Sequence, residues 1–181
     1  MLRRRSTDLR AADARTYPTT DALNDASVTS FSESVALLFE PARRFAAWFA
    51  AARPFESDAE LLAAATRIAH HMSETDQLEL VNAHPRLGAR DRLSQASQRE
   101  QGATGDSVDA ELDRLNAAYE ARFGFHYLVY VAGRPRAELL PEFRAALTHT
   151  RETELRRALD DTLAIAADRL RWFRSPLQED A

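Results

Sequence analysis

The stretch RETELRRALDDTLAIAADRLRWF, residues 151–173, decides the fold class because it is a long periodic segment without glycine or proline. Ile165 and Ala166 belong to an apolar stripe at helical spacing, so the pattern predicts a long closing helix. Arg169 follows three residues after Ala166, at the edge of this stripe. An arginine in that position is either half-buried and paired, or extends its charged end to solvent.

The same periodicity predicts further helices over most of the chain. They are expected at 30–39, 41–52, 57–72, 73–84, 89–101, 107–123 and 135–150. A serine followed three residues later by an acidic residue marks a helix start at Ser30, Ser57 and Ser73. Pro41 suits a first helical turn, whereas Pro141 is expected to kink or split its segment.

One apolar stretch does not fit a helix. FGFHYLVYVAG, residues 123–133, is aromatic and β-branched, and it begins beside Gly124. The predicted fold is therefore all-α: a compact single-domain bundle of roughly eight helices with one short non-helical apolar segment near 124–132. We expect a flexible N-terminal segment at 1–20, one domain at 21–175 and a C-terminal tail at 176–181.

Composition excludes several classes of chemistry. The 181-residue chain has no cysteine, and all 24 of its basic residues are arginine. It therefore has no thiol nucleophile, no thiolate metal site and no lysine for a Schiff base, so acid–base chemistry falls to histidine, carboxylates or tyrosine. A net charge of −4 disfavours nucleic acid as a partner. No apolar run is long enough to span a membrane, and we expect a cytoplasmic protein.

Two polar groups are candidates for chemistry. His84 directly precedes Pro85, which disfavours the α conformation before it and so holds the imidazole at or past a helix end. Ser97, Glu100 and Gln101 share one face if their segment is helical. Taken alone, His84 also fits a capping or surface histidine, and the second group fits a solvated polar face. No histidine spacing predicts a metal site.

Four motifs in this order resemble the family of 2-oxo-4-hydroxy-4-carboxy-5-ureidoimidazoline (OHCU) decarboxylases of urate degradation. They are NAHPRLG at 82–88, SxxEQ at 97–101, LNAAYEARFGF at 115–125 and ELRRALDDTLAIAADRL at 154–170. The opening segments ALNDASVTSFSESVALLFE and ARPFESDAELLAAA are also similar to this family. The resemblance covers roughly 22–173 and implies an all-α carboxy-lyase that forms (S)-allantoin.

The resemblance also implies roles for individual residues. His84 would be catalytic as the acid/base, and Glu100 would act beside it. Substrate-binding residues would be Pro85, Ser97, Gln101, Tyr127, Leu128, Val129, Tyr130, Val131 and Arg169. The chain departs from the family pattern at His126 and Tyr127, where proline and phenylalanine are common.

The implied chemistry suits a chain without lysine or cysteine. The substrate carries its carboxylate beside a ring C=N, which accepts the electron pair that loss of CO₂ leaves behind, so no cofactor and no metal is expected. Two other classes stay open: a helical protein-interaction module and a histidine-phosphotransfer-like bundle, although Pro85 argues against the latter. The sequence leaves open whether the chain forms a homodimer, and whether its substrate is OHCU or a close relative.

Overall fold

The computed structural model of the chain describes residues 17–89 and 106–175, and these residues form helices joined by short connections. Eight helices and no strand occur within the described ranges, which confirms the all-α class. They are α1 (Thr20–Asp25), α2 (Val28–Phe39), α3 (Arg43–Ala51), α4 (Asp58–His71), α5 (Glu74–Ala83), α7 (Asp106–Phe123), α8 (Arg136–Ala146) and α9 (Arg151–Arg174).

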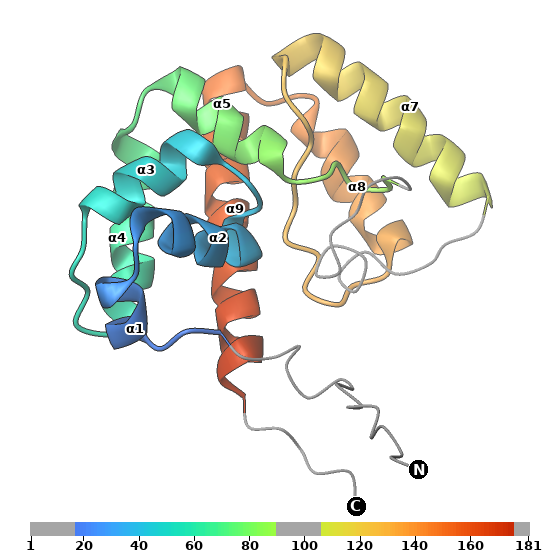
Figure 1. Cartoon of the computed structure of the whole chain (residues 1–181). Helices are drawn as coiled ribbons and strands as arrows, with labels where there is room; N and C mark the ends of the chain where they lie inside the picture. The colour runs from blue at the N-terminus through green and yellow to red at the C-terminus, as the bar shows by residue number, and fades with distance from the viewer. Residues whose placement is uncertain (1–16, 90–105, 176–181) are drawn as a thin grey trace, which may run out of the picture.

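Helix α9 is the centre of the molecule, as Figure 1 shows. It packs against α2, α4 and α5, while α7 and α8 pair with each other on the other side. Thr150 caps its first turn by accepting a hydrogen bond from the backbone N–H of Thr153. The predicted closing helix is confirmed, and its length lets it contact both groups of helices.

Aromatic side chains fill the core on both sides of α9. The group in α2, α3 and the connection to α4 consists of Phe31, Phe39, Phe45, Phe49 and Phe55. The group in α7, α8 and the segment between them consists of Tyr119, Phe123, Phe125, Tyr127 and Phe143. Stacked and edge-to-face ring pairs stabilise such clusters beyond the area that they bury.

Two predicted helix starts are wrong. Helix α2 begins at Val28, because Ser27 rather than Ser30 is its N-cap and accepts a hydrogen bond from the N–H of Ser30 at 3.1 Å. Helix α3 begins at Arg43, so Pro41 lies before the helix and not in its first turn. The reason is a tight turn at Glu40 and Pro41, in which Glu40 has a φ of 57°.

Two other predicted helix starts are confirmed. Ser57 and Ser73 cap α4 and α5 as predicted. Pro141 neither splits nor ends α8. Proline has no N–H group, so the carbonyl four residues earlier loses its hydrogen-bond donor, but both groups lie on the solvent side, where water can bind. Helix α8 ends at Ala146, short of the predicted end at 150. Helix α1 was not predicted, and the helix expected at 89–101 lies almost wholly outside the described residues.

The predicted non-helical apolar segment is present between α7 and α8. Gly124, with a φ of +79°, ends α7, and the chain then runs without helix past Tyr127 to Val131. Figure 1 shows this segment passing between α5 and α8. None of the described helices is both long and apolar enough to cross a membrane.

Candidate functional site

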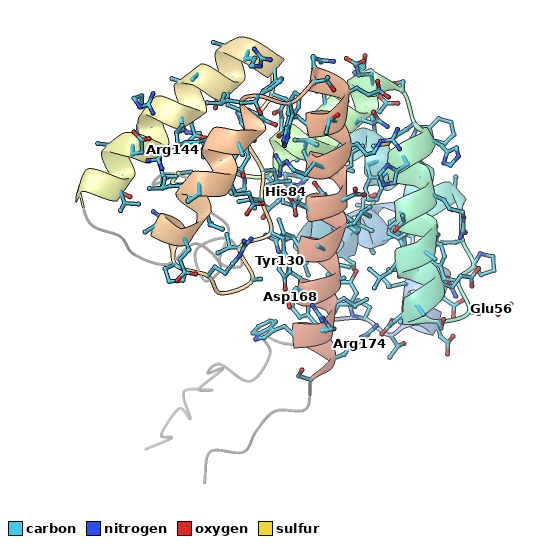
Figure 2. The ribbon with its side chains drawn as sticks, turned by 180° about the vertical axis from the view of Figure 1, so that it is seen from behind. Glu56, His84, Tyr130, Arg144, Asp168 and Arg174 are labelled. Carbon is cyan, nitrogen blue, oxygen red and sulfur yellow. The ribbon has the colours of Figure 1, made fainter. Side chains whose placement is uncertain are left out.

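His84 lies in the interior, at the point where α5 stops. Its backbone is extended, with a ψ of 142°, and its N–H donates to the carbonyl of Val81 at 3.2 Å to close the helix. Pro85 imposes this extended conformation, as the sequence predicted. His84 is the C-cap of α5, but only 2% of it is exposed, so it is not a surface histidine. Figure 2 shows it beside α9.

The two ring nitrogens of His84 have different surroundings. Nδ1 lies 3.3 Å from the carbonyl oxygen of Leu80, which can only accept, so Nδ1 carries the hydrogen in the neutral ring. Nε2 is then the basic nitrogen. It is buried and has no hydrogen-bond partner within the described part of the chain. Buried polar atoms are nearly always paired, so this nitrogen is open to a ligand or to a partner outside the described residues.

Arg169 and Glu40 form a buried ion pair near this imidazole. Arg169 is 1% exposed, and its Nη2 donates to Oε1 of Glu40 at 2.9 Å. Its Nη1 donates to the carbonyl of Leu38 at 3.2 Å. Of the two states that the sequence allowed for Arg169, the structure has the paired one. Sequence reasoning missed Glu40, although a carboxylate at the C-terminal end of a helix is unfavourable and indicates that it has a partner.

The surroundings keep His84 neutral. Burial lowers the pKa of His84 to about 4, and the positive charge of Arg169 acts in the same direction. The negative charge of Glu40 and the hydrogen bond to Leu80 oppose this shift only in part. At neutral pH the imidazole can therefore accept a proton at Nε2 but has none to give there.

The predicted backbone segment from Tyr127 to Val131 is fixed mainly through its carbonyl groups. Leu128 accepts a hydrogen bond from Nη1 of Arg157 at 2.8 Å. Tyr130 accepts from Nη2 of Arg134 at 2.8 Å, and Val131 accepts from Nε of the same arginine at 3.1 Å.

The donor groups of this segment differ from its carbonyl groups. The N–H groups of Leu128, Val129 and Val131 have no acceptor among the described residues. All three residues are buried, and Tyr130 is half-buried. Buried N–H groups of this kind are suited to carbonyl or carboxylate oxygens of a ligand.

Two asparagines that sequence reasoning missed hold the loops around His84. Nδ2 of the fully buried Asn116 donates to the carbonyl of Leu87 at 2.8 Å, which fixes the turn after Pro85. Oδ1 of Asn82 accepts from the backbone N–H of His126 at 2.9 Å. These contacts place the start of the extended segment next to the end of α5. The only signal for these two asparagines in the sequence was a polar, uncharged residue inside each of the motifs NAHPRLG and LNAAYE.

Three predicted residues, Ser97, Glu100 and Gln101, lie outside the described residues, so their placement stays a prediction. Pro85 follows His84 directly and is partly buried. No group of three or more histidine and acidic side chains suited to a metal ion occurs in 17–89 and 106–175.

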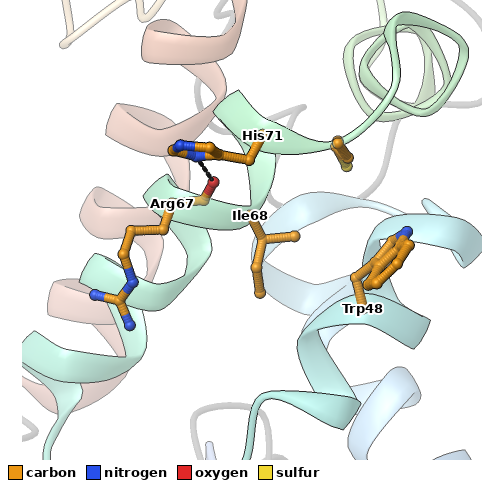
Figure 3. A pocket seen from close by; sticks show the side chains of 5 residues that line it. Trp48, Arg67, Ile68 and His71 are labelled. Atoms are coloured by element: carbon orange, nitrogen blue, oxygen red, sulfur yellow. Dashed lines mark hydrogen bonds between the residues drawn. The ribbon is translucent and has the colours of Figure 1, made fainter.

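A surface pocket lies elsewhere, between α3 and α4 (Figure 3). It has a volume of about 400 Å³ and is lined by Trp48, Arg67, Ile68, His71 and Met72. The Nδ1 of His71 is hydrogen-bonded to the backbone carbonyl of Arg67 at 2.7 Å. None of these residues belongs to the group around His84, and the lining is mainly apolar.

Comparison with known proteins places the whole helical region in one family. The sequence model described as OHCU decarboxylase matches residues 10–171. The chain is 33% identical to the 2-oxo-4-hydroxy-4-carboxy-5-ureidoimidazoline decarboxylase of Haloferax volcanii over 146 residues, which cover 78% of this chain and 87% of that protein. It is also 33% identical to the uric acid degradation bifunctional protein PucL of Bacillus subtilis, but spans only 32% of its length.

Solved structures agree with this assignment. A crystal structure of OHCU decarboxylase in the presence of (S)-allantoin superimposes with a TM-score of 0.61 at 26% identity, over 72% of this chain and 89% of that chain. A crystal structure of (S)-allantoin synthase, at 23% identity, has the same fold with a TM-score of 0.64 over 86% of this chain and 54% of that chain. The chain therefore belongs to the OHCU decarboxylase family, as its four motifs indicated.

Proposed function

We propose that this chain removes CO₂ from OHCU to give (S)-allantoin, with His84 as the group that accepts and returns protons. The single observation that carries this role is the buried Nε2 of His84, which has no partner in the described part of the chain and lies near the Glu40–Arg169 pair. Membership of the family supplies the substrate class.

The reaction needs little beyond position and proton transfer. The bond from the ring carbon to the carboxylate breaks, CO₂ leaves, and the electron pair moves into the adjacent C=N, whose nitrogen takes up one proton from solvent. The 4-hydroxyl group loses its proton and becomes a carbonyl, while a proton is added to one face of the neighbouring carbon. Neutral His84 is suited to take the hydroxyl proton at Nε2, and the imidazolium that forms is suited to return one. The substrate holds the electrons itself, so the proposed step uses no cofactor.

Arg169 and the extended segment are the proposed binding groups. An arginine clamped on the departing carboxylate would stabilise the ground state and slow the step. We infer that Arg169 instead meets carbonyl or ureido oxygens that gain charge, and that the N–H groups of Leu128, Val129 and Val131 bind the ring oxygens. Pro85, Ser97 and Gln101 remain proposed contacts, and Glu100 remains the proposed partner of His84. A cytoplasmic location and a homodimer are also proposals.

The burial of His84 disfavours one alternative class. A phosphoacceptor histidine must be reached by another protein, whereas His84 is 2% exposed.

The test is turnover of freshly generated OHCU, followed by the optical activity of the allantoin that forms. Spontaneous loss of CO₂ has no preferred face, so the uncatalysed control gives racemic product. We expect the protein to speed the reaction, to give the S enantiomer in excess, and to keep its rate in EDTA. Racemic product at the uncatalysed rate would reject the proposal, and loss of rate in EDTA that one divalent metal restores would reject the metal-free step.

A further inference from the structure

Glu40 has a backbone conformation that glutamate rarely adopts. Its φ of 57° and ψ of 177° lie in a region that is essentially restricted to glycine, because a Cβ atom clashes there with the neighbouring backbone. The conformation belongs to a tight turn at the end of α2, in which the N–H of Ala42 donates to the carbonyl of Glu40 across Pro41 at 2.8 Å. Glycine at this position would form the same turn without strain.

A second feature also disfavours glutamate here. Residue 40 follows the last turn of α2, where the carbonyl ends of the helix make a negative charge unfavourable. The side chain is nevertheless buried, with 8% of the residue exposed. Backbone strain and helix charge both oppose this residue, so neither the turn nor the helix explains its presence.

The contacts of Glu40 explain it better. Its Oε1 binds Nη2 of Arg169 at 2.9 Å, and the carbonyl of Leu38, two residues earlier in the chain, binds Nη1 at 3.2 Å. Both acceptors belong to the end of α2. A planar guanidinium that is held at two nitrogen atoms by one rigid element has a fixed orientation. The strained turn is therefore the device that places a carboxylate against Arg169.

We propose that Glu40 is a positioning residue, which fixes the Arg169 guanidinium in the direction in which it meets the substrate. The inference rests on the proposed role of Arg169 in substrate binding. Glu40 itself need not touch the substrate. Its effect on turnover should pass through Arg169 and should depend on the presence of an acceptor at position 40.

Two variants separate positioning from a role in folding. Glu40→Gln keeps an acceptor oxygen but also keeps the strained backbone, whereas Glu40→Gly removes the side chain and relieves the strain. If Glu40 only supported the fold, activity would follow stability, and the glycine variant would equal or exceed the glutamine variant. Positioning predicts the opposite order of activity.

The expected result is that kcat/KM falls roughly 10-fold in Glu40→Gln and roughly 100-fold in Glu40→Gly, the range for loss of a charge-assisted hydrogen bond. Most of each loss should appear in kcat. Thermal melts should show the glycine variant folded and at least as stable as the glutamine variant. Asp58→Asn is the control, because it weakens another arginine–carboxylate pair of α9, the 2.7 Å contact between Arg174 and Asp58 at the C-terminal end of the helix, and should keep wild-type kcat/KM.

A double-mutant cycle with Arg169→Gln tests whether the effect passes through the arginine. In the Arg169→Gln background, Glu40→Gly should change kcat/KM by less than about 3-fold. Additive losses, wild-type kinetics in both single variants, or a glycine variant more active than the glutamine variant would each overturn the inference. Absence of OHCU turnover in the wild-type chain is a different result, since it rejects the proposed function itself.

Discussion

Helix α9 carries two arginines in polar clusters, the buried Arg169 and the partly buried Arg157, and the surroundings of the two differ in one respect. Arg157 belongs to a polar cluster with Glu154, Tyr119, His149 and Asp161. In this cluster Glu154 accepts from the hydroxyl of Tyr119 at 2.7 Å and from Nη2 of Arg157 at 2.8 Å, and its Oε1 lies 2.7 Å from Nδ1 of His149. Arg157 also pairs with Asp161 at 2.7 Å.

Arg169, further along the same helix, is paired just as closely with Glu40. The nearby imidazole of His84, however, leaves Nε2 without a partner in the described part of the chain. A buried polar network in which every member is bonded makes a structure rigid, whereas one with an unpaired member is costly unless a ligand completes it. The comparison therefore supports our proposal that the group of His84, Arg169 and Glu40 meets the substrate, whereas the Glu154 cluster stabilises the fold.

The largest expected effect is the loss of activity when His84 is replaced. His84→Asn should lower kcat by 10²- to 10⁴-fold, the usual contribution of an acid–base group, while the unfolding free energy changes by only about 1 kcal/mol. Steady-state kinetics and urea unfolding of the same preparation measure both. Near-wild-type kcat in this variant would show that His84 moves no proton.

In the Glu154 cluster we expect a substitution to lower stability and to leave activity nearly unchanged. Glu154→Gln removes the charge of a fully buried carboxylate and weakens its charge-assisted hydrogen bonds, although Arg157 keeps its pair with Asp161, so the unfolding free energy should fall by about 2 kcal/mol. Turnover per folded molecule, measured at a temperature where the variant is fully folded, should stay within a few-fold of wild type. A large loss of kcat with unchanged stability would place this cluster in the active site.

The pH dependence of stability should also identify the His84 cluster. The pKa of His84 is about 4 in the folded chain, below its ordinary value of 6.5. As the pH falls through this interval, the unfolded chain binds a proton that the folded chain does not, so stability is lost, by about 3 kcal/mol in total. Urea unfolding at pH 4 to 7 measures the loss, and His84→Asn should reduce its slope. Equal slopes would mean that folding does not lower the pKa of His84.

The smallest effect compares two tyrosine hydroxyls in the same aromatic group. The hydroxyl of Tyr127 is buried without a partner in the described residues, whereas that of Tyr119 donates to Glu154. Tyr127→Phe should therefore raise the unfolding free energy by about 1 kcal/mol, and Tyr119→Phe should lower it by about 1–2 kcal/mol. Thermal melts give both signs. Destabilisation by Tyr127→Phe would show that its hydroxyl has a partner after all.

The helical class, the long closing helix at 151–173 and the break at His84 could all be predicted from the sequence. These are local properties: apolar spacing of three to four residues produces a helix, and proline restricts the residue before it. The same reasoning placed Arg169 at the edge of the apolar stripe and found the extended segment near 124–132. The errors at Ser30 and Pro41 were also local, because several serines and a proline competed for the same helix ends.

The neighbours of His84 could not be predicted, because they come from segments that lie far apart in the chain. Glu40 is far from Arg169 along the chain, and no local pattern indicates that a strained turn after α2 brings its carboxylate within 2.9 Å of that guanidinium. The lowered pKa of His84 likewise depends on burial and on charges from other helices. Periodicity shows which face of a helix is apolar, but not which helix covers it, and the chemistry of this cluster depends on that second fact.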